Sequence, residues 1–133
     1  MTTARPFLMF QDGVAQAALD LYFATLPDSK FVHVERYGAE GPGPAGTIKV
    51  ALFTICGREF MCSDSFMKHA FSFTPSSSIF VDCASMEELE RIFGALSEGG
   101  KVMMPPGNYG FSRHFGWCSD RYGVSWQVNL PNT

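Results

Sequence analysis

The chain has 133 residues, a length typical of one domain, and a formal net charge of −3. So small a charge gives no basic surface for nucleic acid or for an anionic membrane, and we expect neither as a partner. The four cysteines are widely spaced and include no C-x-x-C pair, which excludes zinc-ribbon spacing and favours a reducing, cytoplasmic location.

The first half of the chain predicts a strand, a helix and three further strands. The apolar run over 6–10 predicts a strand and ends before Gln11, too short for a signal peptide or a membrane span. Asp12 can cap a helix over about 13–25, whose apolar residues follow helical spacing. The remaining strands are predicted over 31–37, 47–56 and 59–63, with a Gly/Pro-rich loop at 38–46.

The second half repeats this order of elements. A strand is predicted over 77–83, and a helix over about 85–97 begins with Ser85 as its N-cap and Glu88 as the partner in a capping box. Its buried stripe is predicted to consist of Leu89, Ile92, Phe93 and Leu96. Three strands follow, predicted near 101–104, 109–118 and 123–130.

The last predicted strand alternates between apolar and polar side chains. Apolar residues stand at Val124, Trp126, Val128 and Leu130, and polar residues at Ser125, Gln127 and Asn129. Because the side chains of a strand point alternately to its two faces, this pattern predicts an apolar face against helices and a polar face that lines a cavity.

A turn over 120–123 would fix how the last two strands pair. It places Gly116 opposite Gln127 and His114 opposite Asn129. The cavity face of the preceding strand would then carry the small residues Gly110, Ser112, His114 and Gly116. The helix face would carry Tyr109, Phe111, Phe115 and Trp117. Small residues on the cavity face would leave volume for a ligand.

The doubled βαβββ order, over 1–64 and 77–130, resembles the vicinal oxygen chelate superfamily, which includes glyoxalase I, extradiol dioxygenases, and bleomycin and fosfomycin resistance proteins. The C-terminal part looks like the PhnB-like branch, often labelled 3-demethylubiquinone 3-methyltransferase-like, in the stretches FSFTPSSSIFVDC, EELERIFGALSEGGKVMMPPGNYGFSRHFGW and DRYGVSWQV. The resemblance implies an α+β fold of the glyoxalase/bleomycin resistance/dihydroxybiphenyl dioxygenase type. Its two units would form a curved mixed-sheet cup within a single domain over 1–133.

In metal-dependent members of the superfamily, the ligands come from the first and last strands of each half. Carried over to this chain, the resemblance implies no His, Glu or Asp at 5–8 and hydroxyls at 76–78 where a His is needed. Asp64 stands near the expected carboxylate, and Gln127 replaces the usual Glu. Neutral amides and alcohols bind Zn²⁺ or Ni²⁺ weakly compared with imidazole, so we expect neither a metal nor another cofactor.

The methyltransferase label of the branch is not expected to describe the activity, because we see no glycine-rich nucleotide loop to hold S-adenosylmethionine. The candidate ligand-binding residues are Gln127, Asp64, Ser78, His114 and Asn129. Three of them have an alternative. Gln127 could face solvent or a dimer partner, Asp64 could cap or turn the chain at 63–65 instead of facing the cup, and His114 could be structural rather than an acid or base.

Three functions remain open at this stage. The first is a metal-independent module that binds a small, partly apolar molecule. The second is a metal-dependent lyase, isomerase or dioxygenase of the same superfamily, and the third is an interaction protein whose cup is filled by its own side chains. We expect a homodimer, because an open cup leaves sheet edges and apolar surface. The Phe-rich stretch at 66–73 is a candidate lid or dimer contact, unless it packs into its own core.

Overall fold

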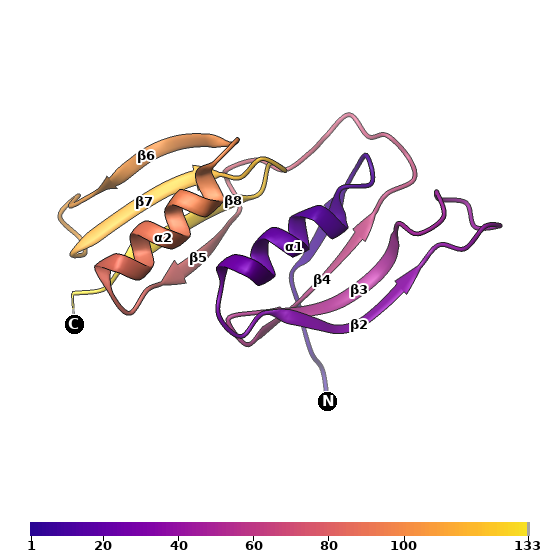
Figure 1. Cartoon of the computed structure of the whole chain (residues 1–133), viewed down its shortest axis with the longest axis horizontal. Coiled ribbons are helices and arrows are strands. Elements are labelled where there is room, and N and C mark those ends of the chain that lie inside the picture. The colour runs from indigo at the N-terminus through magenta and orange to yellow at the C-terminus, as the bar shows by residue number, and fades with distance from the viewer. Residues whose placement is uncertain (133) are drawn as a thin grey trace. The chain divides into compact units, whose positions relative to one another are not determined.

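The computed structural model describes residues 1–132 and separates them into two compact units, Met1–Phe71 and the chain from Ser72 onward. Each unit is built in the order strand, helix, three strands, as predicted (Figure 1). Each forms its own four-stranded mixed sheet, with the unit's helix packed on one face. The α+β class and the doubled βαβββ order are therefore confirmed.

The first unit consists of β1 (Phe7–Phe10), α1 (Ala15–Thr25), β2 (Lys30–Arg36), β3 (Ile48–Ile55) and β4 (Arg58–Asp64). Its sheet has the order β1-β4-β3-β2, in which β1 pairs with β4 in parallel and the other pairs are antiparallel. Helix α1 buries a stripe that includes Leu19 and Tyr22, both fully shielded from solvent. The parallel pair joins the first and last strands of the unit, so the end of β4 lies beside the start of α1.

The start of α1 differs from the expectation that Asp12 caps it. Asp12 and Gly13 both adopt positive φ, 65° and 72°, and Val14 occupies the N-cap position without a side-chain hydrogen bond. The cap comes instead from Asp64 at the end of β4, whose Oδ1 accepts the Ala15 N–H at 2.9 Å. A left-handed turn over two residues carries the Asp12 side chain away from the helix, and a carboxylate from a neighbouring strand takes its place.

The second unit consists of β5 (Ser78–Asp82), α2 (Met86–Ser97), β6 (Lys101–Gly107), β7 (His114–Ser119) and β8 (Ser125–Leu130). Its sheet repeats the topology of the first, in the order β5-β8-β7-β6 with β5 and β8 parallel. The helix start is as predicted, since the Ser85 hydroxyl accepts the Glu88 N–H at 3.1 Å. The predicted stripe is buried, and it comprises Leu89, Ile92, Phe93 and Leu96.

The pairing of β7 with β8 differs by one residue from the predicted register. Trp117, not Gly116, stands opposite Gln127, and His114 stands opposite Leu130 instead of Asn129. The turn is longer than expected, because the Asp120 N–H donates to the Val124 carbonyl and leaves three residues in the loop. Asp120 Oδ1 also accepts the N–H groups of residues 122 and 124 at 2.8 and 3.1 Å, which stabilises this longer turn.

The register reverses the predicted faces of β7. A Cβ on Gly116 would lie 2.6 Å from a ring carbon of Phe93, so Gly116 faces α2. Phe115 and Trp117 point to the opposite face of the sheet. The alternation of β8 itself is confirmed, because the residues predicted for its apolar face are all buried, namely Val124, Trp126, Val128 and Leu130.

Candidate functional site

The five predicted ligand-binding residues fall into two groups. Asp64 belongs to the first unit, and the other four belong to the second. In the second unit, Ser78, Gln127 and Asn129 share the face of the sheet opposite α2. His114 is on the α2 side, paired with the buried Leu130, so the structure does not bring it to Gln127.

We call the sheet surface opposite α2 the polar-aromatic face. Strand pairing assigns to it Ser78, Phe80, Phe115, Trp117, Ser125, Gln127 and Asn129. Gln127 stands between Phe80 on β5 and Trp117 on β7. The face therefore combines hydrogen-bonding side chains from the parallel pair with aromatic rings on both sides of them.

The polar residues of this face are only partly satisfied. Ser125 Oγ lies 2.6 Å from Ser78 Oγ and accepts the Trp117 Nε1–H at 2.8 Å. Asn129 Nδ2 donates to Asp82 Oδ1 at 2.9 Å, whereas Asn129 Oδ1 is buried without a partner among residues 1–132. The half-buried Gln127 amide makes no side-chain hydrogen bond within the same residues. Unused hydrogen-bonding capacity therefore remains on both.

An aromatic cluster extends the face. Phe115 is 4% exposed, and its ring centroid lies 4.9 Å from that of Phe111, 6.2 Å from Tyr109 and 6.3 Å from Phe80. These three neighbours are 43–56% exposed. Such rings offer a surface that a planar or apolar molecule can cover. The predicted register put three of these rings, Tyr109, Phe111 and Phe115, on the helix face, because the turn that it assumed was too short.

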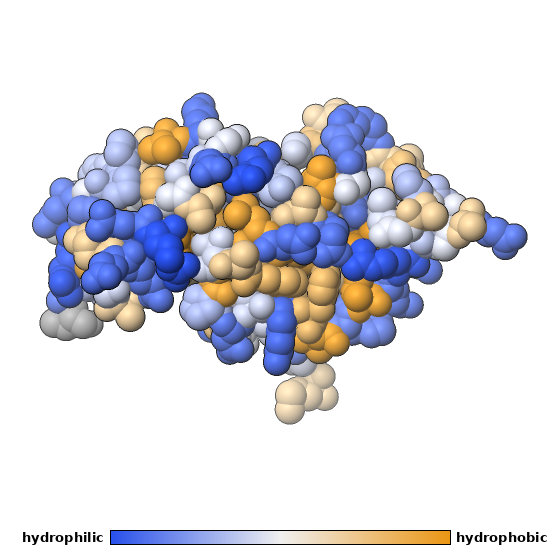
Figure 2. Space-filling view, viewed as in Figure 1, coloured by the Kyte–Doolittle hydropathy of each residue, from blue (hydrophilic) through white to orange (hydrophobic). Residues whose placement is uncertain are grey.

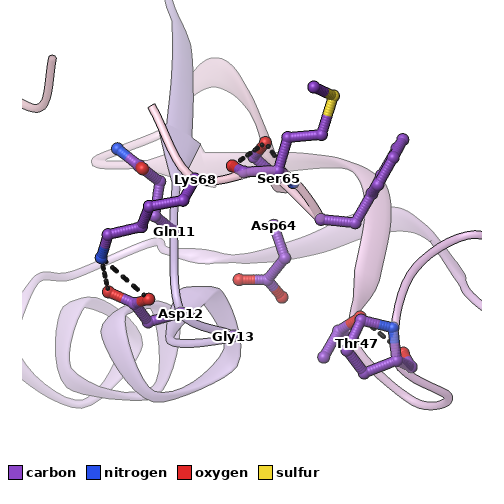
Figure 3. A pocket seen from close by; sticks show the side chains of 10 residues that line it. Gln11, Asp12, Gly13, Thr47, Asp64, Ser65 and Lys68 are labelled. Carbon is purple, nitrogen blue, oxygen red and sulfur yellow. Dashed lines mark hydrogen bonds and ion pairs between the residues drawn. The ribbon is translucent and has the colours of Figure 1, made fainter. Parts of the chain in front are cut away.

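A pocket in the first unit was not anticipated from the sequence. It has a volume of about 450 Å³ and is lined by Gln11, Asp12, Gly13, Pro44, Thr47, Asp64, Ser65, Phe66, Met67 and Lys68. Figure 3 shows the Asp64 carboxylate in its centre, with Asp12 and Lys68 on one side and Thr47 on the other. The lining comes from three segments distant in sequence, so no local motif marks the pocket. The Asp12-Gly13 turn and the Gly/Pro-rich loop are its only sequence signals.

Asp64 is 3% exposed and joins two parts of the unit. Oδ1 accepts the Ala15 N–H at the start of α1, and Oδ2 accepts the Ile48 N–H at the start of β3, each at 2.9 Å. Of the alternative that Asp64 caps or turns the chain, the capping role is therefore borne out, at the start of α1. Its carboxylate stabilises a helix and a strand that are remote in sequence.

One wall of the pocket is the segment 65–71, which Gln11 holds in place. The Gln11 side chain accepts the His69 N–H and donates to the Phe71 carbonyl, both at 2.8 Å. Phe66, Met67 and Phe71 nevertheless remain 51%, 58% and 62% exposed. These three side chains of the Phe-rich stretch are therefore not buried in the core of the chain. Figure 2 shows that hydrophobic residues reach the surface.

Two kinds of reactive group among the ionisable side chains are relevant to catalysis, namely a metal-binding cluster and a reactive thiol. In the part of the chain that the structure describes, no three His, Cys, Asp or Glu side chains are grouped so that they could hold a metal ion. Burial, with a smaller contribution from the nearby Asp64, raises the pKa of Cys62 to about 12. Burial and Asp120 raise the pKa of Cys118 to about 12 in the same way. Both thiols stay protonated at neutral pH, which excludes them as thiolate nucleophiles or ready metal ligands.

Glycine spacing gives no nucleotide site either. Residues 41–46, Gly-Pro-Gly-Pro-Ala-Gly, do fit the spacing G-x-G-x-x-G, contrary to our reading of the sequence. They connect the antiparallel strands β2 and β3, so no helix N-terminus follows to bind a phosphate. Among residues 1–132, no helix combines the length and apolar character that crossing a bilayer requires.

Known proteins share both the fold and much of the sequence. A PhnB protein from Bacillus cereus is 44% identical, with a TM-score of 0.92 over 97% of this chain and 99% of that chain. Protein PA1353 from Pseudomonas aeruginosa is 30% identical, with a TM-score of 0.82 over 98% of each chain. Protein YjdN of Escherichia coli is 26% identical over 87% of this chain and 78% of its own length.

The family described as 3-demethylubiquinone-9 3-methyltransferase matches residues 2–129, nearly the whole chain. The TM-score of 0.92 shows that the PhnB protein also shares the fold of this chain. The chain therefore belongs to this family, as does its PhnB relative.

Proposed function

We propose that the protein is a metal-independent module that binds a small, partly apolar molecule on the polar-aromatic face of the second unit. The observation that carries the proposal is the unpaired amide of Gln127, which is half-buried, has no hydrogen-bond partner among residues 1–132 and stands between Phe80 and Trp117. An amide set between aromatic rings suits a ligand that combines a polar group with an apolar body.

Neighbouring residues support the same kind of ligand. Asn129 Oδ1 needs a donor, and Ser78 lies on the adjacent strand of the same face. The exposed rings around Phe115 provide apolar contact. We therefore assign ligand binding to Gln127, Asn129 and Ser78. We leave out His114, which lies on the α2 side of the sheet, and we consider Asp64 with the first unit, to which it belongs.

We do not propose a methyltransferase activity, although the family description names one. The glycine-rich loop at 41–46 is followed by a strand and not by the helix that a nucleotide-binding loop requires. A metal-dependent reaction is the competing function. FosX from Listeria monocytogenes, whose structure was solved with Mn(II), has a TM-score of 0.64 but only 12% identity, and this likeness shows the fold alone.

The first test is the variant Gln127→Leu. It removes hydrogen-bonding capacity but keeps bulk, so it should weaken ligand binding by on the order of 1–3 kcal/mol. Ligands that co-purify are identified by mass spectrometry and then titrated by calorimetry. Glu90→Leu on the exposed side of α2 is the matched control and should leave the affinity unchanged.

Metal removal is the second arm of this test. Treatment with a chelator should leave the affinity unchanged, because only hydrogen bonds and apolar contacts are involved. If the chelator abolishes ligand binding, or abolishes an enzyme activity that the untreated protein has, the metal-dependent lyase, isomerase or dioxygenase function replaces the proposal. An unchanged affinity in Gln127→Leu would place the ligand elsewhere.

The proposal includes a cytoplasmic homodimer. Phe7 and Phe71 are 52% and 62% exposed, and a second copy of the chain could cover these rings. Sedimentation equilibrium at high micromolar concentration is expected to give the mass of two chains. A single-chain mass under those conditions contradicts this part of the proposal.

A further inference from the structure

We propose that the pocket of the first unit is a second, separate binding site, and that it takes a small protonated amine with a short apolar or aromatic body. The lining of the pocket belongs entirely to the first unit, whereas Gln127 belongs to the second. The pocket volume of about 450 Å³ is within the range of small-molecule pockets.

The central charge is a buried carboxylate without a cation. Asp64 is 3% exposed, and among residues 1–132 no Lys, Arg or His forms an ion pair with it. Its two oxygens each accept one backbone N–H, from Ala15 and Ile48. A carboxylate oxygen has two acceptor directions, so one on each oxygen is still available. An ammonium group in the pocket would donate further hydrogen bonds to these oxygens and would supply the opposite charge.

An anionic ligand is disfavoured at the same place. At the start of α1, Asp64 accepts the Ala15 N–H, and its negative charge opposes a second anion there. The remaining charged groups of the lining are Asp12 and Lys68, which pair with each other at 3.0 Å. The lining thus holds two carboxylates and one ammonium, and its net charge is negative.

The walls suit a compact apolar body. Phe66 and Met67 are 51% and 58% exposed and border the pocket together with Pro44. The Phe66 ring meets the Tyr37 ring edge to face, with centroids 6.2 Å apart. An aromatic ring next to a buried carboxylate also favours a bound cation through its negative face. A ligand of this shape would bury both the apolar wall and the charge.

Benzylamine, protonated at neutral pH, is the probe. Titrated into the isotopically labelled protein, it should bind in the millimolar range or tighter and shift the backbone N–H resonances of Ala15 and Ile48, which donate to Asp64. Benzyl alcohol and benzoate have similar shapes but are neutral and anionic. Each should bind at least tenfold more weakly. Equal binding of either control, or shifts confined to other residues, would overturn the proposal.

A wall variant provides the second measurement, since variants of Asp64 are expected to disturb folding. Phe66→Ala removes the ring that borders the pocket and should weaken benzylamine binding at least threefold. Phe7→Ala is the matched control, because Phe7 is equally exposed, at 52% against 51%, and lies outside the lining. The same affinity in Phe66→Ala and the unaltered protein would refute the site, whatever the result for Gln127→Leu.

Discussion

Replacing Asp64 by alanine is expected to lower the free energy of unfolding by about 2–5 kcal/mol, because it leaves two buried backbone N–H groups without an acceptor. These groups belong to Ala15 and Ile48, both fully shielded from solvent. The change also removes a negative charge from the start of α1. Urea unfolding, followed by circular dichroism, measures the loss.

The control for this variant is Asp12→Ala. Asp12 is also an aspartate of the pocket lining, but its side chain is 66% exposed and only pairs with Lys68. Surface ion pairs contribute about 0–1 kcal/mol, so this variant should be nearly as stable as the unaltered chain. Equal losses in the two variants would show that Asp64 does not stabilise the first unit through its hydrogen bonds.

Replacing Gly100 by alanine is expected to cost about 3 kcal/mol or more, because the added methyl group collides with backbone and not with a movable side chain. A Cβ at this position would lie 2.0 Å from the Ser119 carbonyl oxygen and 2.8 Å from the carbonyl carbon of Asp120. Relief requires separating β6 from β7, which pair at Lys101 and Ser119.

Gly94→Ala is the matched control for this variant. Nothing lies within 4 Å of a Cβ on Gly94, which is inside α2. Alanine there should stabilise the protein by about 0.5–1 kcal/mol, because glycine is a poor helix former. Thermal unfolding should therefore give a lower Tm for Gly100→Ala and a higher Tm for Gly94→Ala than for the unaltered protein. A Gly100→Ala protein as stable as the parent would contradict the close approach of the two strands.

The parts of the fold that depend on neighbouring residues were predictable. The α2 start follows from Ser85 and Glu88, which bond within one turn of helix. The alternation of β8 correctly predicted that its apolar side chains are buried and that Gln127 is on the other face, although Ser125 and Asn129 on that face are buried as well. In each case the signal and its structural consequence lie within a few residues of each other.

The predictions that were wrong concern features that depend on distant residues or on the length of a turn. The α1 cap comes from Asp64, 49 residues away from Ala15, so the nearby Asp12 was the wrong choice. One extra turn residue, stabilised by Asp120, shifted β7 against β8 and reversed the predicted faces of Gly116 and Trp117. The sequence did not predict the pocket for the same reason, because the residues that line it come from three segments that are remote in sequence.

The pairing of first and last strands within each unit bears on how the chain folds during synthesis. All four strands of the first sheet, and the aspartate that fixes α1, occur before Phe71. A ribosome that has released this much chain has therefore supplied every partner that the first sheet requires. Folding can then proceed from the N-terminus while the second unit is still being translated, which shortens the time that unpaired strand edges are exposed to aggregation.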